Sequence, residues 1–342
     1  MTSFYVQGAV PLEATAYVER AFESEVLRVA LARRSLLLLG PRQHGKTSAL
    51  IRVKRLLREA GFDAALVDLQ EIPPSRYEDF LRRVAYAIAR DCAVDIDESH
   101  VRDPASFEDW LAEACPPGSA PIVLIIDEAS AIVDDEQRNT FYGQIRALKN
   151  RAADASPGSL PARLICIFAG TFRWESLVET ENSPFNVIDK IYSEDFSLDQ
   201  ALDLARAQRA SDFSEVAKAT YDFVGGQPYL LQRVLLSVAE APAREDDVFE
   251  RLIAAFRRGD DLHFQALVQK VESDARLIAL VDKLVSDGHL SNEPADYDLK
   301  YLEVVGVTSL QEDNYVFRND AYKNVFESNV RVRRNREPRL PM

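Results

Sequence analysis

The chain has 342 residues, of which 47% are hydrophobic and 28% are charged. This length allows two or three domains, and the composition is that of a globular protein with a large core. The net charge of −14 at pH 7 disfavours a general affinity for nucleic acid or anionic membranes, because both carry negative charge. Residues 331–342 are the exception, since they hold five arginines and one glutamate.

Cysteine and histidine placement argues against structural metal sites. The three cysteines, Cys92, Cys115 and Cys166, are widely spaced and form no metal-binding or redox pattern, so we expect reduced thiols and a cytoplasmic location. The four histidines are also scattered, so no zinc site is predicted. Polar residues interrupt every apolar run well below the length of a membrane span, and we expect neither a signal peptide nor a membrane segment.

The first strong signal lies at residues 36–51. After an amphipathic helix that starts near Phe22, four leucines predict a short buried strand, and residues 40–47 then read G-x-x-x-x-G-K-T. The apolar stretch that follows opens a helix. This order of strand, loop and helix predicts a phosphate-binding loop, for which a chance match in a surface loop is the alternative.

Each residue type in this motif has a chemical reason. The glycines allow backbone N–H groups to turn towards phosphate oxygens, and the following helix adds the positive end of its dipole. We expect Lys46 to reach the β- and γ-phosphates and the Thr47 hydroxyl to bind Mg²⁺. The other motif residues that we expect at the nucleotide are Gly40, Pro41, Gln43, His44, Gly45 and Ser48.

Further strands are predicted at 62–69, 121–126 and 164–170. Helices separate them at 77–91, at 107–114 with Ser106 as its cap, and at 136–153. This alternation favours a parallel sheet covered on both faces.

The strand at 121–126 ends in two carboxylates, Asp127 and Glu128. A parallel sheet presents the carboxyl ends of its strands to ligands. Asp127 would therefore hold Mg²⁺, directly or through water, and Glu128 would act as general base on the attacking water. A strand-end turn is the alternative reading, and the upstream phosphate-binding motif favours the functional one.

A polar residue also ends the strand at 164–170. In ATPases with a strand added between the two motif strands, this position carries a "sensor 1" residue. Thr171 is the candidate here, with Arg173 as a candidate contact of the γ-phosphate. A strand-end cap for Thr171 and a surface charge for Arg173 are the alternatives.

Helices dominate from residue 196 onwards. Ser197 and Gln200 fit a capping box, and helices at about 198–210, 213–223, 229–241 and 246–258 predict a compact helical lid. Between two of them, Gly225 and Gly226 would end one helix and Pro228 would begin the next. Helices at 275–286 and 297–305, a short hairpin at 310–318 and a helix from 320 to about 327 form a winged-helix pattern.

Taken in order, these motifs resemble a known family. Residues 41–48, Pro-Arg-Gln-His-Gly-Lys-Thr-Ser, look like the loop of the bacterial AAA-like ATPase domain, in the STAND class of signal-transduction P-loop ATPases. The similarity spans about residues 4–330. The other blocks that agree are Tyr17–Arg20, Ile126–Glu128, Ser183–Val187, Gly225–Leu230 and Asn319–Phe326.

The resemblance implies an α/β P-loop ATPase core with a parallel, AAA-like sheet, followed by a helical lid and a C-terminal winged-helix domain. We expect the core at 1–195, the lid at 196–260, the winged helix at 261–330 and a basic tail at 331–342. The implied ligands are ATP or ADP with Mg²⁺. The resemblance also implies that Val18 and Arg20 border the adenine, where Val18 could equally be a plain core residue, and that Gly226 and Pro228 touch the nucleotide.

The leading interpretation is a slow ATPase switch of the STAND type. Its nucleotide state would control homo-oligomerisation or the binding of a separate effector or sensor protein in signalling or defence. Two departures bear on this. Most relatives have glycine where Glu19 stands, and no repeat array follows residue 330, which suggests a sensor on another chain.

Two other functions compete with the switch. An ATP-dependent DNA-binding protein of the origin-recognition or transposon-targeting type shares the layout, but the charge of −18 over residues 1–330 disfavours it. A nucleotide-binding scaffold without hydrolysis is disfavoured because Lys46, Thr47, Asp127 and Glu128 are all intact.

Overall fold

The computed structural model describes residues 4–14, 17–73, 76–94, 97–118, 120–173, 188–206, 213–241, 245–293 and 296–336. The chain divides into two compact units. The sheet unit comprises Glu19–Leu39 and Lys46–Ser193, and the helical unit comprises Met1–Val18, Gly40–Gly45 and Glu194–Met342. One boundary therefore lies just before the predicted phosphate-binding motif, and another crosses it between Gly45 and Lys46, so that six of its residues belong to the helical unit.

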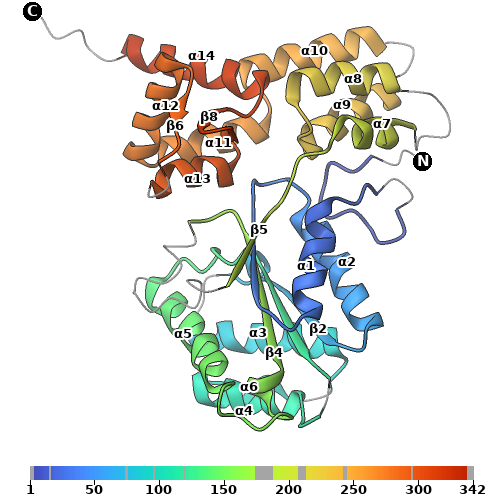
Figure 1. The fold of residues 1–342 in the computed structure, drawn as a ribbon, viewed down its shortest axis with the longest axis vertical. Helices are drawn as coiled ribbons and strands as arrows, with labels where there is room; N and C mark the ends of the chain where they lie inside the picture. Colours follow the sequence, from blue (N-terminus) through green and yellow to red (C-terminus); the bar gives the residue numbers. More distant parts are fainter. Residues whose placement is uncertain are drawn as a thin grey trace, which may run out of the picture. The chain divides into compact units, whose positions relative to one another are not determined.

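One parallel sheet of five strands forms the centre of the sheet unit, in the order β2-β3-β4-β1-β5 (Figure 1). Its strands are β1 (Leu36–Leu39), β2 (Asp63–Asp68), β3 (Ile122–Asp127), β4 (Leu164–Gly170) and β5 (Asp189–Tyr192). The predicted α/β core with a parallel sheet is confirmed. β4 lies between β1 and β3, so the strand that precedes Thr171 separates the motif strand from the carboxylate strand.

Helices cover both faces of this sheet. Alternate strand residues such as Leu38 pack with Phe22 of α1 (Ala21–Leu31) and Leu50 of α2 (Lys46–Glu59) in one buried cluster. On the other face, Phe168 of β4 contacts Tyr142 of α5 (Asp135–Arg151), with ring centroids 5.7 Å apart. The sheet is thus buried on both sides, which explains why its central strands read as unbroken apolar runs. The remaining short helices are η1 (Leu69–Glu71), η2 (Glu98–His100) and α6 (Leu160–Arg163).

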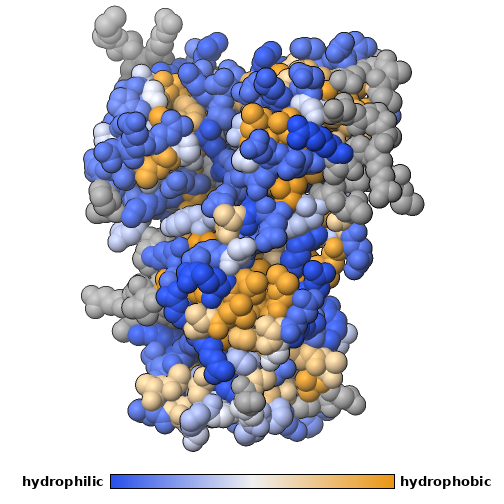
Figure 2. All heavy atoms as spheres, turned by 45° about the vertical axis from the view of Figure 1, so that its right-hand side comes forward, coloured by the Kyte–Doolittle hydropathy of each residue, from blue (hydrophilic) through white to orange (hydrophobic). Residues whose placement is uncertain are grey.

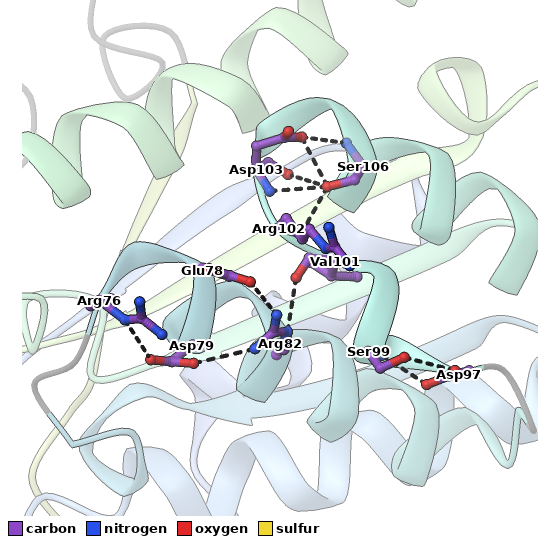
Figure 3. Close-up of polar contacts among 10 residues, drawn as sticks. All are labelled: Arg76, Glu78, Asp79, Arg82, Asp97, Ser99, Val101, Arg102, Asp103 and Ser106. Atoms are coloured by element: carbon purple, nitrogen blue, oxygen red, sulfur yellow. Dashed lines mark hydrogen bonds and ion pairs between the residues drawn. The ribbon is translucent and has the colours of Figure 1, made fainter.

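Helix α4 (Pro104–Ala114) begins earlier than the sequence predicted. The Ser106 N–H donates to Asp103 Oδ1 at 2.8 Å, and Ser106 Oγ accepts from the Asp103 N–H at 3.0 Å (Figure 3). Asp103 is therefore the cap and Ser106 lies inside the first turn, because proline favours the first helical position. Nearby, Arg82 of α3 (Tyr77–Cys92) donates to the Val101 carbonyl at 3.1 Å and ties α3 to the segment before α4.

Eight helices lie in the described part of the helical unit. They are α7 (Leu198–Arg206), α8 (Ser214–Val224), α9 (Pro228–Glu240), α10 (Glu245–Arg258), α11 (Leu262–Glu272), α12 (Ala275–Asp287), α13 (Tyr297–Val305) and α14 (Asp320–Arg336). The predicted capping box is confirmed at the start of α7, where Gln200 N–H donates to Ser197 Oγ at 3.2 Å and Ser197 N–H donates to Gln200 Oε1 at 2.9 Å.

A small antiparallel sheet with the order β6-β8-β7 accompanies these helices. Its strands are β6 (Leu290–Ser291), β7 (Thr308–Gln311) and β8 (Asn314–Phe317), so the predicted hairpin is confirmed. Helix α14 is longer than predicted and includes residues 331–336 of the expected basic tail. Val330 is buried and Arg333 pairs with Asp282 of α12, and these contacts hold the extra turns against the helical unit.

Hydrophilic residues dominate the face drawn in Figure 2, and apolar residues gather there in patches. Large apolar side chains with substantial exposure include Val133 at 79% and Leu262 at 75%. In the described ranges, no helix combines the length and apolar character that a membrane span requires.

Candidate functional site

Four predicted site residues meet at the carboxyl edge of the five-stranded sheet. Thr47 Oγ1 donates to Asp127 Oδ2 at 2.6 Å, and Lys46 Nζ donates to Thr171 Oγ1 at 3.2 Å. Lys46 and Thr47 are the first residues of α2, Asp127 ends β3, and Thr171 follows β4. The parallel topology brings them together, because parallel strands end at the same edge.

The Thr47–Asp127 pair has the chemistry of a magnesium site. Mg²⁺ prefers hard oxygen donors and binds proteins through one or two such side chains, leaving other positions for water and phosphate oxygens. Adjacent ligands of an octahedral Mg²⁺ lie about 3.0 Å apart, given metal–oxygen distances of about 2.1 Å. The observed 2.6 Å separation needs only a small opening to fit this geometry.

Glu128 occupies an unusual backbone conformation beside this pair. Its φ of +49° lies in the left-handed region, which is uncommon for a residue with a side chain. Hydrogen bonds fix the turn, since Glu128 N–H donates to Asp127 Oδ1 at 3.0 Å and Ala129 N–H donates to the Ala169 carbonyl at 2.8 Å. Backbone strain of this kind clusters at functional sites. At the half-buried Glu128, the chain leaves the regular path of the strand.

The other predicted site residues of the sheet unit are Ser48, Arg173 and Arg20. Ser48 is buried in α2, and Arg173 is partly buried two residues after Thr171. Arg20 is buried where α1 begins: its N–H donates to Glu23 Oε1 at 3.1 Å, and its guanidinium lies 4.7 Å from the centre of the Phe22 ring. These contacts give Arg20 a structural role in starting the helix.

Gly226 lies in the helical unit, in close backbone contact with Phe196. The Phe196 N–H donates to the Gly226 carbonyl at 2.8 Å, and a Cβ atom at Gly226 would lie 1.8 Å from the Phe196 carbonyl oxygen. Only glycine fits there. Pro228 is the buried first residue of α9, and half-buried Val18 belongs to the same unit.

Gly226→Ala should destabilise the helical unit by about 3 kcal/mol or more, because overpacking against rigid backbone is costly. Thermal unfolding followed by circular dichroism would measure it. Gly143→Ala is the matched control: this exposed glycine lies within α5 with no heavy atom within 4 Å of an added Cβ. Alanine there should stabilise by up to about 1 kcal/mol. Equal melting of Gly226→Ala and wild type would contradict the close contact.

The loop Gly40–Gly45 makes its described side-chain contacts within the helical unit. Gln43 and Gly45 have φ values of +56° and +79°, and positive φ in such a turn favours an anion-binding concavity of backbone N–H groups. The Gln43 carbonyl accepts from Gln227 Nε2 at 3.5 Å. Gln43 Oε1 lies 2.8 Å from Nδ1 of His263, whose Nε2 lies 2.7 Å from the Tyr322 hydroxyl.

Burial lowers the pKa of His263 to about 4, so the ring is neutral at pH 7. A neutral imidazole has one donor and one acceptor nitrogen. The two contacts satisfy both when Nδ1–H donates to Gln43 and Nε2 accepts from the Tyr322 hydroxyl.

His44, the neighbouring loop residue, is fully buried against an ion pair. Its Nε2 lies 2.9 Å from both Asp195 Oδ1 and Arg318 Nη2. Arg318 binds Asp195 through both arms, with Nε to Oδ2 at 2.8 Å and Nη2 to Oδ1 at 2.7 Å. Burial acts to raise the pKa of Asp195, but the Arg318 guanidinium and the His44 hydrogen bond outweigh it and hold this pKa well below its usual range.

Sequence reasoning named Gln43 and His44 but missed their partners. Gln227 lies between the predicted site residues Gly226 and Pro228 and could have been noticed there. Asp195 and His263 belong to none of the motifs on which the prediction rested, and Arg318 entered only as the last residue of the predicted hairpin. The predicted block Ser183–Val187 lies outside the described residues.

A family model now places this fold and site among known proteins. The model of the AAA-like domain matches residues 5–328. The chain belongs to the AAA-like domain family. A curated relative of this AAA-like chain is an uncharacterized WD repeat-containing protein of Synechocystis sp., 22% identical over 364 residues. The match covers 96% of this chain but spans only 30% of that protein's length.

Three solved structures share the fold of this AAA-like chain. The Walker-type ATPase of Pyrococcus abyssi has a TM-score of 0.64 at 15% identity, covering 95% of this chain and 99% of that one. The ORC2 protein of Aeropyrum pernix, solved as ADPNP-ADP complexes, has a TM-score of 0.53 at 12% identity, covering 97% of both chains. Cdc6p of Pyrobaculum aerophilum has a TM-score of 0.50 at 13% identity, covering 95% of this chain and 100% of that one. The AAA-like chain thus has the fold of P-loop ATPases.

Proposed function

We propose that this AAA-like protein binds ATP with Mg²⁺ and hydrolyses it slowly. The observation that carries the proposal is the paired contact at the sheet edge, Thr47 to Asp127 and Lys46 to Thr171. A lysine, a hydroxyl and a carboxylate at the end of a phosphate-binding motif are the groups that bind the phosphates and magnesium of a nucleotide. The AAA-like family and the nucleotide complexes of the ORC2 protein support the same ligand.

Each residue has a definite role in this proposal. Lys46 binds the β- and γ-phosphates, while Thr47 and Asp127 hold Mg²⁺, which when bound neutralises phosphate charge. Glu128 accepts a proton from the attacking water. Thr171 orients the reacting groups and Arg173 contacts the γ-phosphate. In the helical unit, the N–H groups of Gly40–Gly45 bind phosphate oxygens, and Gly226 and Pro228 contact the nucleotide. Val18 and Arg20 border the adenine.

We infer that nucleotide state switches the protein between two forms, as in the STAND ATPases that its motifs resemble. Six motif residues belong to the helical unit, so a ligand bound to the loop acts directly on that unit. In this reading α7–α10 form the lid, and α11–α14 with the small sheet form a winged helix. A ligand shifts the two forms only through different affinities for them. The output is homo-oligomerisation or the binding of a separate effector or sensor protein.

ATP-dependent DNA binding is the second candidate function. The fold shared with ORC2 and Cdc6p favours it. The charge of −18 over residues 1–330 opposes it, because phosphate binding needs clustered positive charge. In the described part of the tail, Arg331 and Arg334 are exposed on α14.

Two measurements separate the candidates. Light scattering with ADP and with a non-hydrolysable ATP analogue should show a nucleotide-dependent change in assembly mass. Titration with duplex DNA at near-physiological salt should show little binding, and Arg331→Gln with Arg334→Gln should remove what remains. These substitutions spare Arg333, which pairs with Asp282. A constant mass together with tight, salt-steep DNA binding would establish the second candidate and overturn the first.

A further inference from the structure

The two loop positions that precede Gly45, Gln43 and His44, have their side chains engaged by elements distant in sequence. His263 of α11 binds Gln43, and Arg318, which follows β8, lies against His44 together with Asp195. These partners are 220 and 274 residues away along the chain. The side chains of Gln43 and His44 are therefore held by contacts within the helical unit.

A third contact fixes the start of the same loop. Gly306 ends α13 with a φ of +93°, and a Cβ at this position would lie 2.8 Å from Cγ of Pro41. Glycine is thus required both for the backbone turn and for the approach of α13 to the loop. Gln43 and His44 are held by different parts of the helical unit, and the end of α13 lies close to Pro41.

Arg318 is the central group of this arrangement. Its side chain is only 10% exposed, and its fork spans Asp195 and His44. One ring nitrogen has one in-plane position, so His44 Nε2 either donates to Asp195 or accepts from Arg318. In both cases the Arg318–Asp195 pair sets where the ring lies, and the ring in turn fixes the loop backbone beside Gly45.

We propose that Arg318 is a positioning residue for the phosphate-binding loop, which it holds in its binding conformation through His44 and Asp195. This inference rests on the proposed nucleotide binding, and it assigns to the C-terminal hairpin and α14 a part in setting nucleotide affinity. A loop already held in place has no ordering cost on binding, so releasing it weakens affinity. Arg318 itself makes no contact with the nucleotide.

Arg318→Lys is the informative variant. Lysine keeps the positive charge beside the partly buried Asp195, but its single ammonium cannot span Asp195 and His44 as the guanidinium fork does. Calorimetry should show affinity for Mg-ATP about tenfold weaker, the size expected for losing a hydrogen bond to a charged group. Arg333→Lys is the matched control, because it alters the ion pair that Arg333 of α14 makes with Asp282 of α12 and should leave the affinity unchanged.

A double-mutant cycle separates positioning from direct contact. His44→Leu fills the buried space and leaves the Arg318–Asp195 pair intact. If Arg318 acts through His44, adding Arg318→Lys to His44→Leu should produce no further loss of affinity. Additive losses would mean that Arg318 contacts the nucleotide directly and would overturn the proposal. Stronger binding by Arg318→Lys would also overturn it, because the contacts would then oppose nucleotide binding.

Hydrogen exchange tests, without nucleotide, whether Arg318 holds the phosphate-binding loop. In Arg318→Lys the amides of residues 42–45 should exchange about tenfold faster than in wild type, while those of β3 stay unchanged. Unaltered exchange in the loop would refute the positioning role even if nucleotide binds. Conversely, a wild-type chain that fails to bind Mg-ATP refutes the proposed function, and the exchange measurement still decides whether Arg318 holds the loop.

Discussion

Lys46→Ala is expected to lower the affinity for Mg-ATP by about a hundredfold or more. The ammonium would make charge-assisted hydrogen bonds to two phosphates, each worth about 1.5–3 kcal/mol, and alanine makes none. Lys46 is only 4% exposed and its Nζ contacts Thr171, so the charge is already held at the sheet edge before a ligand arrives. Alanine at the start of α2 preserves helix propensity.

Isothermal calorimetry measures this affinity, and circular dichroism checks that the fold is retained. Arg55→Ala is a suitable control, because Arg55 lies on α2 and its side chain is 50% exposed in a pair with Glu59. That variant should bind as the wild type does. Unchanged binding by Lys46→Ala would refute the assignment of the phosphate site.

Glu128→Gln should bind Mg-ATP with wild-type affinity and hydrolyse it about 10²–10⁴ times more slowly. Glutamine keeps the shape of the side chain but cannot accept a proton from water, and general-base catalysis contributes a factor of this size. The hydrogen bonds that hold the turn involve the backbone of Glu128 and the Asp127 carboxylate, so the substitution leaves them in place. The variant should accumulate the ATP-bound form.

Single-turnover release of phosphate, measured beside nucleotide affinity, separates the chemical step from binding. The control is Glu136→Gln, which alters an exposed glutamate in the first turn of α5. It should hydrolyse ATP at the wild-type rate. The same rate in Glu128→Gln would exclude this carboxylate as the base.

Much of the sheet unit could be predicted from sequence because its signals are local. The runs Leu36–Leu39 and Ile122–Ile126 are continuous and apolar since both faces are covered, and the motif glycines fix the loop between strand and helix. β5 was missed because Asp189–Tyr192 has no such run, and its place beside β1 depends on pairing with residues 153 positions away. The early start of α4 was missed because Asp103 and Ser106 are both good capping residues.

The loop's partners could not be predicted for a different reason. A lone arginine, histidine or aspartate in a sequence is ordinarily a surface charge, and nothing local distinguishes Arg318, His263 or Asp195 from the rest. Their meaning comes from burial and from contacts more than a hundred residues apart. Such pairings are set by the packing of whole helices, which residue spacing does not encode.

The placement of the cysteines makes the two units separately observable. All three thiols, Cys92, Cys115 and Cys166, lie in the sheet unit, and the sequence of the helical unit contains none. Burial raises the pKa of Cys166 to about 12 and that of Cys115 to about 11, so neither reacts appreciably until the surrounding core opens. The rate at which a thiol reagent modifies Cys166 therefore measures the opening of the sheet unit alone. If a nucleotide slows the modification of Cys166, it stabilises the sheet unit. This effect can be measured even in a variant whose helical unit is unfolded.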